Sequence, residues 1–190
     1  MNLSKNTSIY LTSKDSNSRL KKISESEIST DSKRELQSIR LHPNLLRQTI
    51  LGFGGAFTEA SASIYDQLDI NKKSEIIEAY FGKNGNQYNM GRTHINSCDF
   101  SLGNYALCDV EDRELSNFSI ERDKKMLIPF IKAALKKTSV PLHIMASPWS
   151  PPPWMKTNNQ MNYGGKLKEE YQDTWAEYYC KYIEHYEKNG

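Results

Sequence analysis

The alternation of apolar and polar positions divides most of the chain into strands that are each followed by a helix. Short apolar runs bounded by turn residues predict three strands, at residues 49–57, 87–95 and 142–146. Apolar positions at helical spacing predict helices after each of these strands. The predicted helices cover residues 60–68, 71–81, 119–137 and 171–186. Strands that alternate with helices form parallel sheets, so we expect an α/β fold.

Residues with known capping and helix-breaking preferences mark the ends of these helices. We expect Asn71 to cap the second helix at its N-terminus and Gly82 to end it. Ser119 is placed to begin the third helix, and Pro129 is expected either to kink or to restart it. An aromatic stripe from Tyr171 to Tyr186 predicts that the last helix packs against the core rather than lines a ligand site.

The first part of the chain has a different character. It is rich in Ser, Lys and Glu up to residue 37, which is typical of loops or a weakly ordered arm. Two short apolar runs, Ile9–Leu11 and Ser38–Leu41, predict short strands. We therefore divide the chain into an N-terminal segment of residues 1–47 and a strand–helix region of residues 48–190.

Composition excludes several classes of protein. The chain of 190 residues is 37% hydrophobic and 25% charged, which is typical of globular proteins, and its net charge of +2 gives no support for nucleic-acid binding. Cys98, Cys108 and Cys180 have no metal-ligand spacing, so we expect no metal and a reducing compartment. We see neither a signal peptide nor an apolar run of roughly twenty residues, so a cytoplasmic location without a transmembrane segment is expected.

The glycine-rich segment Gly52–Gly55 invites comparison with dinucleotide-binding motifs. The fingerprint needs a small residue where Phe57 stands and an acid where Lys72 stands, so it fails and no nucleotide cofactor is expected. The glycines are better explained by a close approach of neighbouring backbones.

Two segments after predicted strands carry candidate binding residues. Arg92 lies within the second strand and Asp99 just past its end, where parallel barrels place functional groups. Alternatively, Arg92 and Asp99 pair with each other or cap the loop. Trp149 lies on a rigid proline-rich loop and could stack on a sugar. Alternatively, the two tryptophans of this loop, Trp149 and Trp154, cap the core. His94 is expected to pack in the interior, since no second metal ligand stands at a useful spacing.

Three motifs together resemble one family. GFGGAFTEA at 52–60, RTHINSCDFS at 92–101 and ASPWSPPPWMKTN at 146–158 are similar to glycoside hydrolase family 30, the glucosylceramidase-like enzymes. The resemblance implies a (β/α)8 barrel with a side β-sandwich, and retaining hydrolysis of β-glycosidic bonds. Residues 48–190 would form the first three β/α units of this TIM barrel, and strands in residues 1–47 would belong to the side β-sandwich.

The resemblance also assigns roles to the candidate residues. It implies that Asp99 and Trp149 bind the sugar of a β-glucoside or a glucosylceramide-like substrate, and that Arg92 is a buried arginine beneath the site. In the family, the acid/base glutamate lies in an Asn-Glu-Pro stretch after the fourth strand and the nucleophile glutamate lies after the seventh. The chain contains no Asn-Glu-Pro and is expected to end before either position, and Glu59 is not expected to replace either glutamate. We therefore expect no catalytic residue and an inactive chain, unless a complementary C-terminal fragment supplies them. The alternative is a non-catalytic sugar-binding or interaction remnant.

Overall fold

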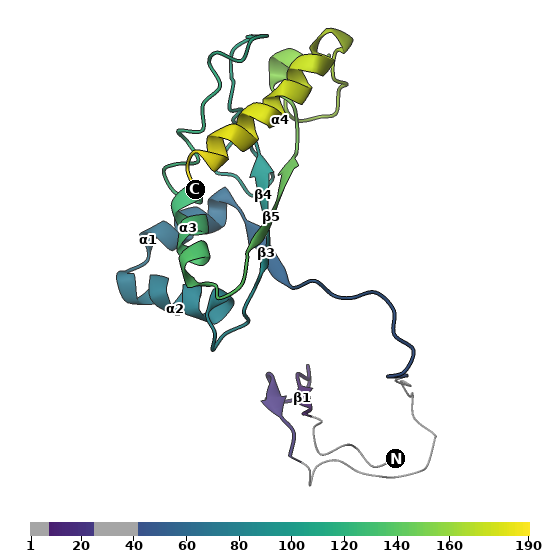
Figure 1. Cartoon of the computed structure of the whole chain (residues 1–190), viewed down its shortest axis with the longest axis vertical. Coiled ribbons are helices and arrows are strands. Elements are labelled where there is room, and N and C mark those ends of the chain that lie inside the picture. Colours follow the sequence, from purple (N-terminus) through teal and green to yellow (C-terminus); the bar gives the residue numbers. More distant parts are fainter. Residues whose placement is uncertain (1–7, 25–41) are drawn as a thin grey trace. The chain divides into compact units, whose positions relative to one another are not determined.

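The computed structural model of the protein describes residues 8–24 and 42–190 (Figure 1). The chain divides into two compact units, residues 1–49 and 50–190. None of the helices in the described part of the chain has the length and apolar character needed to span a bilayer.

The first unit contains a two-stranded antiparallel ribbon. Strand β1 (Tyr10–Leu11) pairs with β2 (Lys21–Lys22), which confirms the short strand predicted near Ile9–Leu11. The strand predicted at Ser38–Leu41 lies outside the described residues. The membership of residues 1–47 in a side β-sandwich stays a prediction.

The second unit is built on a parallel three-stranded sheet, as the strand–helix alternation predicted. Its strands are β3 (Gly54–Phe57), β4 (Met90–Ile95) and β5 (His143–Pro148), in the order β3-β4-β5. On one face of the sheet Ala56, Arg92 and Met145 lie side by side in register, and all three are exposed.

The sheet strands approach closely where glycine leaves room. A Cβ on Gly54 would collide with the backbone carbonyl of Met90 on the neighbouring strand. Only glycine allows β3 and β4 to come this near, which confirms the explanation drawn from the sequence.

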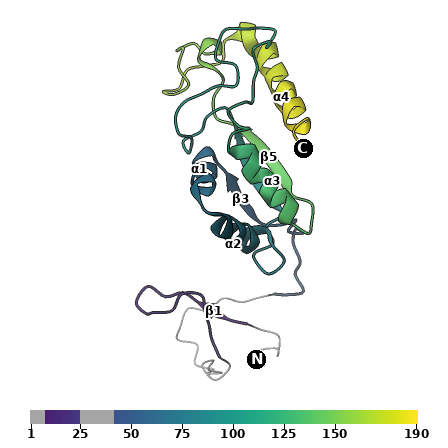
Figure 2. The same ribbon diagram turned by 90° about the vertical axis from the view of Figure 1, so that its left-hand side faces the viewer.

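Three helices cover the opposite face of the sheet (Figures 1 and 2). They are α1 (Glu59–Gln67), α2 (Ile70–Phe81) and α3 (Leu127–Lys137). Phe57 of β3 packs with Ile77 and Phe81 of α2 and with Ile131 of α3 in one apolar cluster.

The helix ends in the structure agree in part with those predicted from the sequence. Asp69, and not Asn71, caps α2, since its carboxylate accepts hydrogen bonds from the Asn71 and Lys72 N–H groups at 2.9 and 3.0 Å. Gly82 ends α2 as predicted. The third helix begins at Leu127, which places Pro129 in its first turn, where a missing N–H costs little.

The helix start predicted at Ser119 is therefore wrong, because residues 121–126 form turns before α3 begins. The Ser119 hydroxyl accepts a hydrogen bond from the Glu121 N–H at 3.3 Å and so caps a turn. Of the two outcomes predicted for Pro129, the restart is the observed one.

The last helix, α4 (Gln172–Glu187), follows two single 3-10 turns, η2 (Pro153–Met155) and η3 (Glu169–Tyr171). Its Tyr178 and Tyr182 are fully buried in a second apolar cluster with Ile95 of β4. The prediction that the aromatic stripe belongs to the core is confirmed.

Candidate functional site

A cavity of about 310 Å³ lies beside the loops that leave the carboxyl ends of β4 and β5. Asp99 comes from the loop after β4 and Trp149 from the loop after β5, and both line this cavity. The predicted placement of the two residues is confirmed, whereas their role in sugar binding stays a prediction.

The turn that carries Asp99 leaves its carboxylate unengaged. Cys98 and Ser101 close the turn, because the Ser101 N–H donates to the Cys98 carbonyl and the Ser101 hydroxyl accepts from the Cys98 N–H, both at 3.0 Å. Within the described residues Asp99 forms no hydrogen bond or ion pair, so the alternative in which it pairs with Arg92 is not observed.

Arg92 stands against Trp149 on the open face of the sheet. Its guanidinium carbon lies 4.5 Å from the centre of the Trp149 ring, and its Nη2 donates to the Ser147 hydroxyl at 2.9 Å. The expectation of a buried Arg92 is wrong for this chain. Arg92 is exposed, because its face of the sheet has no covering layer among the described residues.

The two tryptophans of the proline-rich loop have different surroundings. Trp149 is 45% exposed and forms no hydrogen bond within the described part of the chain. Trp154 is 9% exposed, packs edge-on against Tyr171 and donates its Nε1–H to the Cys108 carbonyl at 3.0 Å. The alternative that these rings cap the core therefore applies to Trp154 and not to Trp149.

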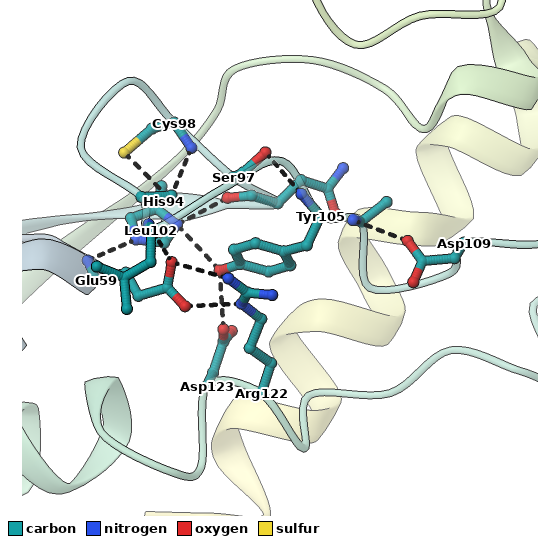
Figure 3. Close-up of polar contacts among 12 residues, drawn as sticks. Glu59, His94, Ser97, Cys98, Leu102, Tyr105, Asp109, Arg122 and Asp123 are labelled. Atoms are coloured by element: carbon teal, nitrogen blue, oxygen red, sulfur yellow. Dashed lines mark hydrogen bonds and ion pairs between the residues drawn. The ribbon is translucent and has the colours of Figure 1, made fainter. Parts of the chain in front are cut away.

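Glu59, at the start of α1, braces the loop that carries Asp99 (Figure 3). Its carboxylate accepts from Arg122 Nε at 2.7 Å and from the Leu102 N–H at 2.8 Å. Burial would raise the pKa of Glu59, but the hydrogen bonds from Arg122 and Leu102 outweigh burial and hold the pKa below its usual range. A buried, paired carboxylate of this kind is unsuited to donate a proton as a general acid.

His94 lies in the interior beside this ion pair. Its Nε2 accepts from the Glu59 N–H at 3.2 Å, which leaves Nδ1 to donate to the Asn96 carbonyl at 2.7 Å. These partners fix the orientation of the ring, and the 2% exposure of His94 confirms that it packs inside. The residues that the structure describes contain no group of three or more His, Cys, Asp or Glu side chains that could hold a metal.

A buried carboxylate ties the same loop to the last helix. Asp123 accepts hydrogen bonds from the hydroxyls of Tyr105 at 3.0 Å and Tyr186 at 2.8 Å. Burial raises the pKa of Asp123, although both tyrosine hydrogen bonds lower it. Asp123, which lies within the stretch 119–137 predicted to be a helix, is instead a buried link between the loop and α4.

Asn96 joins the two loops that carry Asp99 and Trp149. Its amide nitrogen donates to the Ser150 carbonyl at 3.0 Å, and its Oδ1 accepts from the Tyr178 hydroxyl at 2.6 Å and the Leu107 N–H at 3.0 Å. Asn96 has a φ of +62°, a conformation that asparagine tolerates better than most residues. The sequence offered one signal for this role, an asparagine directly after a strand.

The fold and this arrangement can now be compared with known proteins. Residues 50–190 match the model of the glycosyl hydrolase family 30 TIM-barrel domain. The chain belongs to this family. It is 43% identical to putative glucosylceramidase 3 of Caenorhabditis elegans over 75% of its length, and 40% identical to lysosomal acid glucosylceramidase of Mus musculus over 80%.

Solved structures of the family give the same result. The chain superposes on SrfJ from Salmonella typhimurium with a TM-score of 0.72 and 42% identity, over 75% of this chain and 32% of that one. It superposes on the endo-β1,6-glucanase BT3312 with a TM-score of 0.69 and 28% identity, over 79% and 34% of the two chains. The present chain covers 28% of the C. elegans relative and 31% of the Mus musculus relative, so it spans less than a third of the length of either.

Proposed function

We propose that this chain is the sugar-holding N-terminal part of a retaining β-glycosidase that resembles glucosylceramidase. The observation that carries the proposal is that Asp99 and Trp149, from two different loops, line one cavity. We further propose that residues 48–190 form the first three β/α units of a TIM barrel and that the strands in residues 1–47 belong to a side β-sandwich.

The chemistry of the cavity supports binding of a sugar. An unengaged carboxylate such as that of Asp99 can accept hydrogen bonds from two neighbouring hydroxyls. Trp149 contributes a partly exposed aromatic face and an N–H that no described residue accepts. Arg92 stacks on the Trp149 ring and so helps to hold it in place beside the cavity.

Hydrolysis needs groups that the chain does not supply. Retaining glycosidases use two carboxyl groups about 5 Å apart, one as the acid and one as the nucleophile. No Asn-Glu-Pro occurs in the 190 residues, and Glu59 is held by Arg122. We therefore propose that the chain alone binds a β-glucoside or a glucosylceramide-like substrate without cleaving it, and that a complementary C-terminal fragment would supply the two glutamates.

A sugar titration tests the binding half of this proposal. Methyl β-glucoside added to the purified chain should shift the fluorescence of Trp149, and Asp99→Ala should weaken the apparent affinity by about tenfold or more, as expected for loss of a charge-assisted contact. Asp173→Ala, an exposed acid on α4, is the matched control and should change nothing. Equal affinities for the wild type and Asp99→Ala would contradict the proposal.

An activity assay tests the other half. With an activated aryl β-glucoside, the chain alone should show no turnover above background. Turnover that persists through further purification and disappears in Asp99→Ala would show that the chain is itself an enzyme. A non-catalytic sugar-binding or interaction protein is the second candidate, because the cavity residues are present without the two glutamates. Activity restored by adding a fragment with both glutamates would favour the split enzyme over it.

A further inference from the structure

Met161 forms part of the wall of the cavity that Asp99 and Trp149 line. It also lines an adjoining cavity of about 380 Å³, so it lies between the two cavities. Met161 belongs to the loop of residues 157–166, which follows η2 along the chain. The position of this loop therefore sets the shape of the space beside Asp99 and Trp149.

The backbone of this loop adopts a conformation that needs support. Asn159 and Tyr163 have φ angles of +50° and +62°, which lie in the left-handed region. Asparagine tolerates this region, whereas tyrosine rarely adopts it. Backbone strain of this kind persists only where surrounding contacts oppose it, so specific contacts must hold the loop in place.

Side chains hold the loop from within and from both sides of Met161. The Asn158 amide donates to three backbone carbonyls of the loop at 3.0–3.5 Å. The Lys156 ammonium donates to the Met161 carbonyl at 3.0 Å. The Met161 sulfur lies 3.8 Å from the hydroxyl of Ser97, which belongs to the loop that carries Asp99. Lys156 thus fixes the residue that connects the two loops of the cavity.

The Lys156 ammonium is a buried charge without a carboxylate beside it. Lys156 is 6% exposed, and within the described residues its ammonium donates to the Met161 carbonyl and pairs with no Asp or Glu. Burial lowers the pKa of Lys156. A charge in such a place lowers the stability of the fold, and an apolar side chain of similar length would lower it less. Stability therefore does not account for a lysine at this position.

We propose that Lys156 is a positioning residue of the sugar site, which holds Met161 against the loop of Asp99 so that the cavity is formed before a β-glucoside binds. A wall that is already in place saves the ligand the free energy of ordering the loop. The proposal rests on the proposed function, because it takes this cavity to be the place where the sugar binds.

Lys156→Met tests the proposal in the whole 190-residue chain, because methionine nearly keeps the length of the side chain and removes the charge. The affinity for methyl β-glucoside, measured by calorimetry, should fall about threefold to tenfold, as expected when a ligand must order one or two side chains. The melting temperature should stay within about 2 °C of the wild type or rise, because a buried charge is removed. Amide hydrogen exchange should become faster in residues 157–166 and stay unchanged in the sheet.

Two further variants separate the charge from the substitution itself. Lys166→Met is the matched control and should bind like the wild type, because Lys166 lies in the same loop but is exposed and lines neither cavity. Lys156→Arg keeps a positive charge and N–H donors, so it should bind methyl β-glucoside more tightly than Lys156→Met does.

The outcomes distinguish this proposal from the proposed function. If Lys156→Met binds methyl β-glucoside as tightly as the wild type, the positioning role is wrong, while a loss of binding in Asp99→Ala still upholds the proposed function. A loss of affinity that comes with a lower melting temperature would also overturn the proposal, since Lys156 would then only stabilise the fold. Absence of binding by the folded wild type would overturn both.

Discussion

Arg122 and Glu59 meet in an ion pair whose Nε and Oε1 atoms lie 2.7 Å apart, although the two residues belong to different segments of the chain. The same carboxylate accepts the Leu102 N–H, so the pair connects the start of α1 with the loop that carries Asp99. The Glu59 side chain is buried, whereas that of Arg122 is 40% exposed. Water can therefore solvate the Arg122 guanidinium when Glu59 is removed, which reduces the net contribution of this ion pair to the free energy of unfolding.

Glu59→Gln should lower the free energy of unfolding by about 1–3 kcal/mol at neutral pH, because it weakens a charge-assisted hydrogen bond in a buried site. The loss should shrink in acid. The folded protein holds the pKa of Glu59 below its unfolded value, so this stabilisation is complete above the unfolded pKa and is lost as pH falls through the folded one.

Urea unfolding of the wild type and Glu59→Gln at several pH values measures this difference. Other carboxylates titrate in the same range in both proteins, so the difference between the two curves isolates Glu59. A gap that stays constant from pH 7 to about pH 3 would contradict the assignment of a lowered pKa.

Asn96 should be sensitive to substitution, because its side chain joins Ser150, Leu107 and Tyr178. Asn96→Gly removes these hydrogen bonds but tolerates the positive φ, and should cost about 2–3 kcal/mol of stability. Asn96→Ala should cost about 1 kcal/mol more, because alanine is strained in this conformation. Chemical unfolding measures both, and Asn96→Gly within about 0.5 kcal/mol of the wild type would argue against the role.

The close approach of β3 and β4 at Gly54 can be tested by substitution, with Gly103 as the control position. Gly54→Ala should destabilise the protein by about 1–3 kcal/mol, because the new methyl group meets the Met90 carbonyl. Gly103→Ala should be nearly neutral, because a Cβ at that position meets no atom within 4 Å. Thermal unfolding of both variants measures the contrast, and similar melting temperatures would show that the strands can separate without cost.

The free chain should be marginally stable and prone to aggregate. Among the described strands, β3 and β5 each pair on one side only, and unpaired strand edges recruit other chains. The open sheet face adds apolar surface at Met145, which is 58% exposed. Met145→Lys should therefore reduce light scattering at a given concentration. A soluble monomer with a sharp, cooperative thermal transition would contradict this prediction.

The fold of residues 50–190 could largely be predicted from local patterns. Strand and helix periods differ, so the apolar positions distinguished β3, β4 and β5 from the helices between them. Gly82 and Pro129 act through their own backbones, so their effects on helix ends were also visible in the sequence. The prediction of Asn71 as an N-cap failed because Asp69, two residues earlier, offers a carboxylate to the N–H groups of Asn71 and Lys72, so that Asn71 lies within the first turn of the helix.

The sequence by itself determined the order of the elements, the rigid proline-rich loop and the motifs that carry Asp99 and Trp149, since all of these depend on neighbouring residues. Only the tertiary structure decided which distant groups meet. Glu59 pairs with Arg122, Asn96 reaches Ser150, and Met161 lies between two cavities. The tertiary structure also decided that Arg92 is exposed, because the burial of a residue depends on which segments pack over it. The pattern of apolar and polar positions reports only on residues that are near one another in the sequence. These contacts join distant segments, so they could not be predicted from the sequence alone.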